Sequence, residues 1–122
     1  MKRDFLLYMD DIIESIQRID EYISGLDYEQ FAKDPKLVDA VSRRLEIIGE
    51  AVKNIPSEIK ERQPDLRWKG IVGMRDVLAH GYFGIDPKRV WNIVKNDLQT
   101  LKQGITALKT RIEEEKNGGK NG

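Results

Sequence analysis

Apolar residues recur every three or four positions along most of the chain, and nowhere do they alternate as they would in a strand. The first stripe predicts a helix that ends at Gly25, because glycine adopts left-handed backbone angles at little cost. Its members are Phe5, Met9, Ile12, Ile16, Ile19 and Ile23. A loop over residues 26–33 is expected next, with Tyr28 and Phe31 folded back onto the core.

Two Asp-Pro pairs, Asp34-Pro35 and Asp86-Pro87, mark the starts of later helices. The aspartate accepts hydrogen bonds from first-turn amides, and proline at the first helical position loses no helical bond. The second helix is expected to run to Pro56, with a stripe of Val38, Val41, Leu45, Ile48, Val52 and Ile55. One long final helix is expected after Pro87, with a stripe of Val90, Val94, Leu98, Leu101, Ile105, Leu108 and Ile112.

The stretch between these helices is less regular. A short turn or helix is expected over residues 57–63, between two prolines, and a third helix over about residues 66–80, weakened by Gly70 and Gly73. The pattern therefore predicts an all-α, up-and-down bundle of four main helices plus a short one. We expect a single domain over residues 1–116 and a disordered, glycine-rich tail over residues 117–122.

Several residues outside the main stripes have two interpretations. Ile13, Ile47 and Ile93 either widen the core or face a partner chain. Trp68 and Trp91 either anchor packing or stack on bases. Three basic clusters either track a phosphate backbone or only keep the surface soluble. These clusters are Arg43-Arg44, Arg67 with Lys69, and Lys88-Arg89.

Composition limits the possible chemistry. The 122 residues suffice for one domain with a real core, and 21 basic residues balance 21 acidic ones. The chain has no cysteine and a single histidine, His80. These counts exclude disulfides, a cysteine nucleophile, a thiolate zinc site and a polyhistidine metal site within one chain. No signal peptide or membrane span is apparent, so a cytoplasmic protein is expected.

The segment MRDVLAHGYFGIDP concentrates the candidate chemistry, because it holds Arg75, Asp76, His80 and Tyr82 within eight residues. Histidine exchanges protons near neutral pH, and arginine offers a charged fork of donors to phosphate oxygens. Such a pair is the minimum for metal-free cleavage of RNA, with a base for the ribose 2′-hydroxyl and a cation for the charge on phosphorus. A histidine at a helix C-terminus also has a purely structural explanation, through the helix dipole.

Spacing and number both raise the prospect of a dimeric site. On a regular helix Arg75 and His80 lie roughly 140° apart, so they converge only if the helix unwinds near Ala79 or a second copy supplies the missing group. One histidine per chain also leaves the acid and base roles one group short, and a two-fold dimer would bring two histidines together.

The second helix adds a polar stripe beside its apolar one, made of Arg43, Ile47, Glu50 and Asn54. Glu50 has two interpretations. It either belongs to a solvated, salt-bridged face with Glu46, or it is partly buried beside Gly49 and orients Arg75.

The segment from Arg75 to Tyr82 matches the pattern arginine, four residues, histidine, any residue, tyrosine. It resembles the motif of the HepT-like toxins of the HEPN superfamily. The resemblance extends over about residues 5–112, through four segments that occur in the family's order: YMDDIIESIQRIDEYI, RRLEIIGEAVKNIPSEI, PDLRWKGIVGMRD and DPKRVWNIVKNDL. Members of the family often have asparagine after the motif arginine, whereas this chain has Asp76.

The resemblance implies a HEPN helical bundle that forms a homodimer with the motif in the dimer cleft. It implies a metal-independent endoribonuclease without cofactor, the toxin of a type II or type VII toxin–antitoxin pair. Arg75 and His80 would be catalytic, with Asp76 as their polar neighbour, and Glu50 keeps the supporting role suggested above by its position on the second helix. The partner would be an MntA-like nucleotidyltransferase that transfers AMP to Tyr82, and the substrate would be RNA.

Two other functions are compatible with the sequence. One is a non-catalytic subunit that presents nucleotide or substrate to a minimal nucleotidyltransferase. The other is a plain helical dimer in which Arg75 and His80 are structural.

Overall fold

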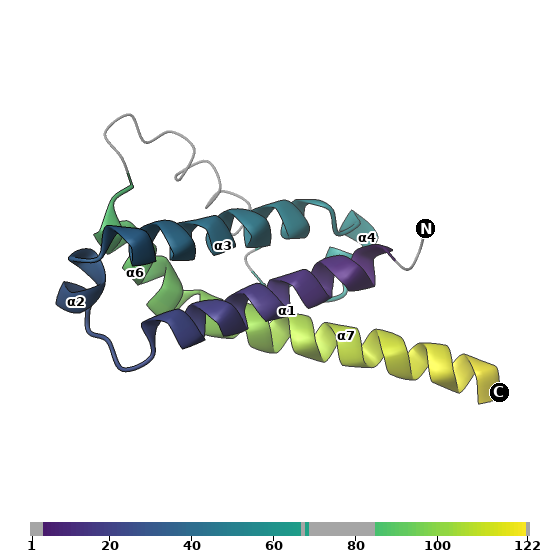
Figure 1. The fold of residues 1–122 in the computed structure, drawn as a ribbon. Coiled ribbons are helices and arrows are strands. Elements are labelled where there is room, and N and C mark those ends of the chain that lie inside the picture. Colours follow the sequence, from purple (N-terminus) through teal and green to yellow (C-terminus); the bar gives the residue numbers. More distant parts are fainter. Residues whose placement is uncertain (1–3, 67, 69–84, 122) are drawn as a thin grey trace.

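The computed structural model describes residues 4–66, 68 and 85–121, and all its regular elements there are helices (Figure 1). They are α1 (Asp4–Ile23), α2 (Tyr28–Ala32), α3 (Pro35–Lys53), α4 (Ser57–Lys60), α6 (Pro87–Asn96) and α7 (Leu98–Asn121). The predicted third helix, with Gly70 and Gly73, lies almost wholly outside the described residues. The predicted all-α bundle is confirmed for the described residues.

The centre of the fold is the packing of α1 against α3 and α7. The stripes predicted from the sequence form this core. Met9, Ile12, Ile16 and Ile19 of α1 are fully buried, as are their counterparts on the other helices. Those counterparts include Val41, Leu45, Ile48, Val52, Leu98, Ile105 and Leu108. A core on one stripe of each helix is the outcome that a three-to-four-residue period dictates.

The two Asp-Pro starts are confirmed. The Asp34 carboxylate accepts a hydrogen bond from the Leu37 amide at 3.2 Å, and the Asp86 carboxylate accepts one from the Lys88 amide at 3.0 Å. Gly25 has a φ of 76°, the left-handed conformation expected after the first helix. The short helix between the prolines is also present, as α4.

The expected loop over residues 26–33 is wrong, because Tyr28–Ala32 form a short helix. Asp27 and Gln30 make a reciprocal capping box: each side chain accepts a hydrogen bond from the other residue's amide, at 2.8 and 3.0 Å. Phe31 of this helix is fully buried, as predicted.

The single long final helix is also wrong, because the chain turns at Asp97 between α6 and α7 (Figure 1). Helix α6 packs against α2, α3 and α7, whereas α7 packs along α1. Because α6 and α7 pack against different helices, they run in different directions.

Helix α7 continues to Asn121, through residues that the sequence predicts to be a disordered tail. The helix includes two glycines of the tail despite the low helix propensity of glycine. A single domain over residues 1–116 remains a prediction.

Candidate functional site

The motif residues Arg75, Asp76, His80 and Tyr82 lie outside the described residues. Glu50 alone of the predicted site residues lies within them. The described part of the molecule shows a groove beside Glu50 and the stretches of chain that precede and follow residues 69–84 in the sequence.

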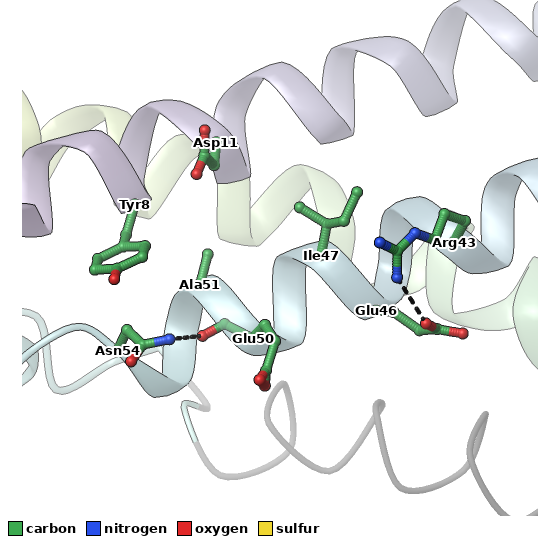
Figure 2. Close-up of a pocket in the computed structure, with 8 residues that line it drawn as sticks. All are labelled: Tyr8, Asp11, Arg43, Glu46, Ile47, Glu50, Ala51 and Asn54. Carbon is green, nitrogen blue, oxygen red and sulfur yellow. Dashed lines mark hydrogen bonds and ion pairs between the residues drawn. The ribbon is translucent and has the colours of Figure 1, made fainter.

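A groove of about 640 Å³ runs between α1 and α3 (Figure 2). Tyr8 and Asp11 line it from α1. The α3 side is Arg43, Glu46, Ile47, Glu50 and Ala51, and Asn54 completes it at the end of that helix. The polar stripe predicted on the second helix, Arg43, Ile47, Glu50 and Asn54, is thus confirmed as one continuous lining.

Glu50 is exposed, which agrees with the interpretation that places it on a solvated face and contradicts the alternative that buries it beside Gly49. Its neighbour Gly49 is buried, whereas Glu50 is among the residues that line the groove. The Glu50 carbonyl oxygen accepts a hydrogen bond from the Asn54 side-chain amide at 2.8 Å. Its role in orienting Arg75 remains a prediction.

Among the described residues that line the groove, Asp11, Glu46 and Glu50 contribute carboxylates and Arg43 contributes a cation. The Arg43 guanidinium lies 3.2 Å from the Glu46 carboxylate, and the two side chains are 71% and 42% exposed.

Residues 57–66, which precede the motif in the sequence, are held on α7. The Arg62 guanidinium donates to the Glu115 carboxylate at 2.5 Å, and the Arg111 side chain donates to the Gln63 side-chain oxygen. Trp68 Nε1 donates to the Gln63 carbonyl oxygen at 3.0 Å. The Arg62 hydrogen bond is the main reason why the pKa of Glu115 lies below its usual value.

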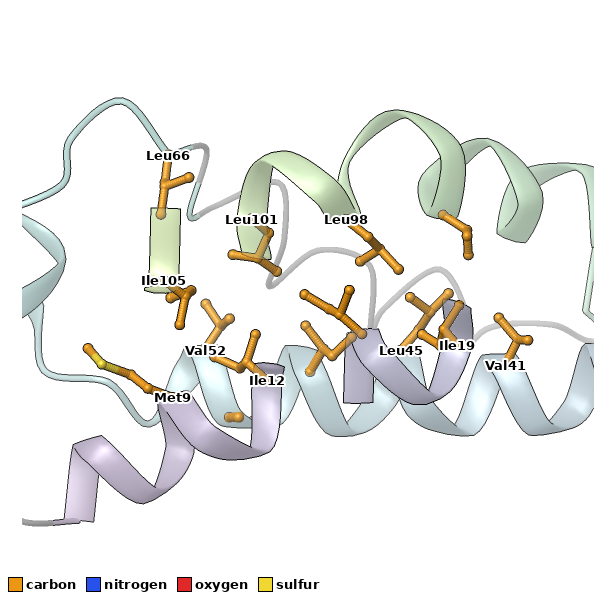
Figure 3. Close-up of a cluster of buried hydrophobic side chains, with 14 of the residues drawn as sticks. Met9, Ile12, Ile19, Val41, Leu45, Val52, Leu66, Leu98, Leu101 and Ile105 are labelled. Carbon is orange, nitrogen blue, oxygen red and sulfur yellow. The ribbon is translucent and has the colours of Figure 1, made fainter. Parts of the chain in front are cut away.

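A close hydrophobic contact completes this attachment. Leu66 is 6% exposed and points toward α7, on the side of Ile105 and Leu101 (Figure 3). It packs against Gly104, where an added Cβ would lie 2.6 Å from Leu66 Cδ2. The sequence analysis missed Gly104. A glycine inside a strongly periodic helix costs about 1 kcal/mol relative to alanine, and that cost was the available signal for a close approach.

The described chain resumes at residue 85, and at the start of α6 Asp86 caps the helix while Trp91 packs inward. The Trp91 ring lies 5.2 Å from the Phe31 ring and 6.1 Å from the Tyr28 ring, measured between centroids. Trp68 also packs against the core. Packing is thus what both tryptophans do within the described structure.

The three isoleucines outside the main stripes occupy two kinds of position. Ile13 and Ile93 are half-buried and pack against the core, so they widen it. Ile47 lines the groove instead.

The described residues contain neither a metal-ligand cluster nor a membrane-spanning helix. No three of their histidine, aspartate or glutamate side chains gather as metal ligands would. None of their helices is both long enough and apolar enough to cross a bilayer.

Comparison with known proteins decides the family. Residues 12–108 match the model of the HepT-like family, described as "Ribonuclease HepT-like". The chain belongs to the HepT-like ribonuclease family. The matched span includes every predicted site residue of this HepT-like chain, from Glu50 to Tyr82.

Curated relatives agree with this assignment. The "Probable ribonuclease HepT" of Thermococcus cleftensis is 45% identical over 109 residues, which cover 89% of this chain and 99% of that protein. A "Putative RNase" of Caldanaerobacter subterraneus subsp. tengcongensis is 39% identical, over 83% of this chain and 90% of its own length.

A longer relative from Methanocaldococcus jannaschii is named "Gamma-glutamylcyclotransferase and putative RNase". It is 40% identical over 96% of this chain, but the HepT-like chain spans only 53% of its length. No solved structure matches the chain significantly.

Proposed function

We propose that this chain is a metal-independent endoribonuclease and the toxin of a cytoplasmic toxin–antitoxin pair, with Arg75 and His80 as its catalytic residues. The observation that carries the proposal is the family match over residues 12–108, because it includes the one arginine–histidine–tyrosine motif of the sequence. The relatives named as ribonucleases support the same activity.

The motif residues would supply the base and the cation for this chemistry. His80 takes the proton of a ribose 2′-hydroxyl, whose oxygen attacks the adjacent phosphorus. Arg75 stabilises the negative charge that develops on the phosphoryl oxygens. The bond from phosphorus to the 5′-oxygen breaks, that oxygen takes up a proton, and a 2′,3′-cyclic phosphate remains.

A homodimer would supply the second proton-transfer group. Each chain has a single histidine, whereas the two proton transfers call for a base and an acid. In a two-fold dimer the His80 of a second copy could protonate the leaving oxygen. Asp76 would support the site by raising the basicity of His80, and Glu50 would support it by orienting Arg75.

The motif also offers a means of control. An MntA-like nucleotidyltransferase would transfer AMP from ATP to the Tyr82 phenol, so that the phenol oxygen bonds to the α-phosphorus and pyrophosphate leaves. The added phosphate would occupy the anion site beside Arg75 and repel RNA.

The test is cleavage of total cellular RNA in the presence of EDTA. We expect the unmodified chain to cut RNA and leave 2′,3′-cyclic phosphate ends. His80→Ala and Arg75→Ala should each lower the rate by roughly 10²-fold or more. Arg18→Ala is the matched control, because Arg18 forms only an exposed ion pair with Glu14 on α1.

Intact mass distinguishes the alternatives. If protein with unmodified Tyr82 does not cleave RNA, the proposal fails and the non-catalytic nucleotidyltransferase subunit becomes the better explanation. The assay must therefore begin with protein whose mass shows no added AMP.

A further inference from the structure

Opposite charges gather on different helices, although the whole chain has 21 basic and 21 acidic residues. Between residues 5 and 23, α1 carries five acidic side chains and one arginine. Helix α6 carries three cationic side chains and no acidic one. Because α1 packs on α3 and α7, whereas α6 packs on α2, α3 and α7, the two charge concentrations occupy different parts of the surface.

The cations of α6 share an exposed surface. Lys88, Asn92 and Lys95 lie within about 60° of one another around the helix, because they are spaced by four and three residues. All three are exposed, and so is Arg89 beside them. The buried side of α6 is formed by Val90 and Val94. We call Lys88, Arg89, Asn92 and Lys95 the α6 cationic face.

No carboxylate of the described residues forms an ion pair with this face. The ion pairs there join Arg18 to Glu14, Arg43 to Glu46, Arg62 to Glu115 and Lys109 to Asp10. The nearby Asp86 carboxylate instead accepts the Lys88 amide as a helix cap. Lys95 Nζ lies 4.7 Å from the centre of the Trp91 ring, a cation–π contact that leaves its charge uncompensated.

We propose that the α6 cationic face binds the phosphate groups of the RNA strand that the motif cleaves. The inference rests on the proposed function, which supplies RNA as the ligand. Helix α6 begins at Pro87, five residues after Tyr82, and five residues span at most about 18 Å. An RNA strand at the motif therefore lies within reach of α6, whose 10 residues extend about 15 Å.

The face should bind without preference for particular bases. Trp91 packs against Phe31 and Tyr28, and Lys95 covers its ring, so that ring is not a platform for a base. The contacts left to the face are those of lysine and arginine with phosphate, which position a strand but do not read its sequence.

The test is the salt dependence of RNA binding. The full chain is titrated onto a fluorescent single-stranded 2′-O-methyl RNA, which cannot undergo attack by a 2′-hydroxyl, and Kd is measured by anisotropy at several KCl concentrations. In the triple variant Lys88→Gln, Arg89→Gln, Lys95→Gln, the slope of log Kd against log [KCl] should fall by about 2, which corresponds to three phosphate contacts. Kd should rise roughly tenfold to a hundredfold at about 0.1 M KCl.

The matched control is Lys53→Gln, Lys60→Gln, Lys116→Gln. It removes the same charge from the end of the bundle opposite α6, at α4 and the ends of α3 and α7 (Figure 1). We expect its slope to stay close to that of the unaltered chain. Equal losses in both variants, or an unchanged slope in the α6 variant, would overturn the proposal.

The outcome is separable from that of the proposed function. His80-dependent cleavage with an unchanged slope in the α6 variant leaves the ribonuclease intact and overturns the binding face. If the slope falls only in the α6 variant and no cleavage is seen, the result supports RNA binding by the α6 cationic face and contradicts the proposed ribonuclease activity. If the α6 variant loses only its binding to a nucleotidyltransferase partner, the face is a protein contact and the proposal is wrong.

Discussion

Leu66 and Gly104 touch so closely that a single added carbon would not fit between them. A Cβ on residue 104 would lie 2.6 Å from Leu66 Cδ2 and 2.9 Å from Leu66 Cγ. Both residues are buried, Leu66 at the end of the α4 region and Gly104 within α7. The contact fixes the chain to α7 two residues before Trp68, ahead of the motif in the sequence.

Gly104→Ala should therefore destabilise the protein. Crowding a packed site costs about 1–3 kcal/mol, and the better helix propensity of alanine returns about 1 kcal/mol. We expect the free energy of unfolding in urea to fall by about 1 kcal/mol. In a Leu66→Ala background the same substitution should be neutral or stabilising, because the space is vacant. If Gly104→Ala stabilises both backgrounds equally, the close contact is unimportant.

Asp86→Ala should loosen the start of α6. The Asp86 carboxylate accepts the Lys88 amide at 3.0 Å, and removing such a cap costs about 1 kcal/mol. We expect a loss of this size in urea unfolding and a much smaller one for Asp86→Ser, which keeps an acceptor oxygen. Asp34→Ala, which removes the equivalent cap of α3, provides a comparison. A loss as large for Asp86→Ser as for Asp86→Ala would contradict the capping role.

Glu115 should titrate at lower pH than an ordinary glutamate. The Arg62 hydrogen bond favours its charged form, so the pKa is lowered from 4.5 in the folded protein. The associated stability is present above about pH 4.5 and is lost as pH falls through the lower, folded pKa. NMR titration of the side-chain carboxyl carbon should show the shift, and Arg62→Gln should raise the pKa toward its usual value. Arg18→Gln should leave it unchanged. A Glu115 pKa that ignores Arg62→Gln would show that the ion pair does not persist in solution.

Tyr82→Phe should separate catalysis from its control. In the proposed mechanism the Tyr82 phenol transfers no proton, so the variant should cut RNA at nearly the unaltered rate. Without the phenol oxygen it cannot accept AMP. Intact mass after incubation with ATP and an MntA-like nucleotidyltransferase should therefore increase for the unaltered chain alone. Equal AMP addition to Tyr82→Phe would place the modification elsewhere.

Helices and their buried faces could be predicted from the sequence because both depend on local spacing. The period of the apolar residues places Met9, Ile16 and Leu45 on the core stripes of their helices, where all three are buried. Asp34 and Asp86 cap their helices through bonds to amides at most three residues away. Such interactions need no distant partner, and the family resemblance agrees with them.

Features that depend on distant partners could not be predicted. The stripe from Val94 to Leu98 and Leu101 continues through Asp97 without a gap, so periodicity gives no sign of the turn between α6 and α7. Glu50 was predicted only in part. Its place on a polar stripe was correct, but its exposure depends on how α1 lies against α3.

The sequence by itself determined the helical class, the core stripes, the caps and the motif, because each is written in spacings of a few residues. Only the tertiary structure decided that Leu66 packs on Gly104, that Tyr8 and Asp11 join the α3 stripe in one groove, and that cations gather on α6 away from the acids of α1. These relationships join residues far apart in the chain, and they exist only once the helices have packed.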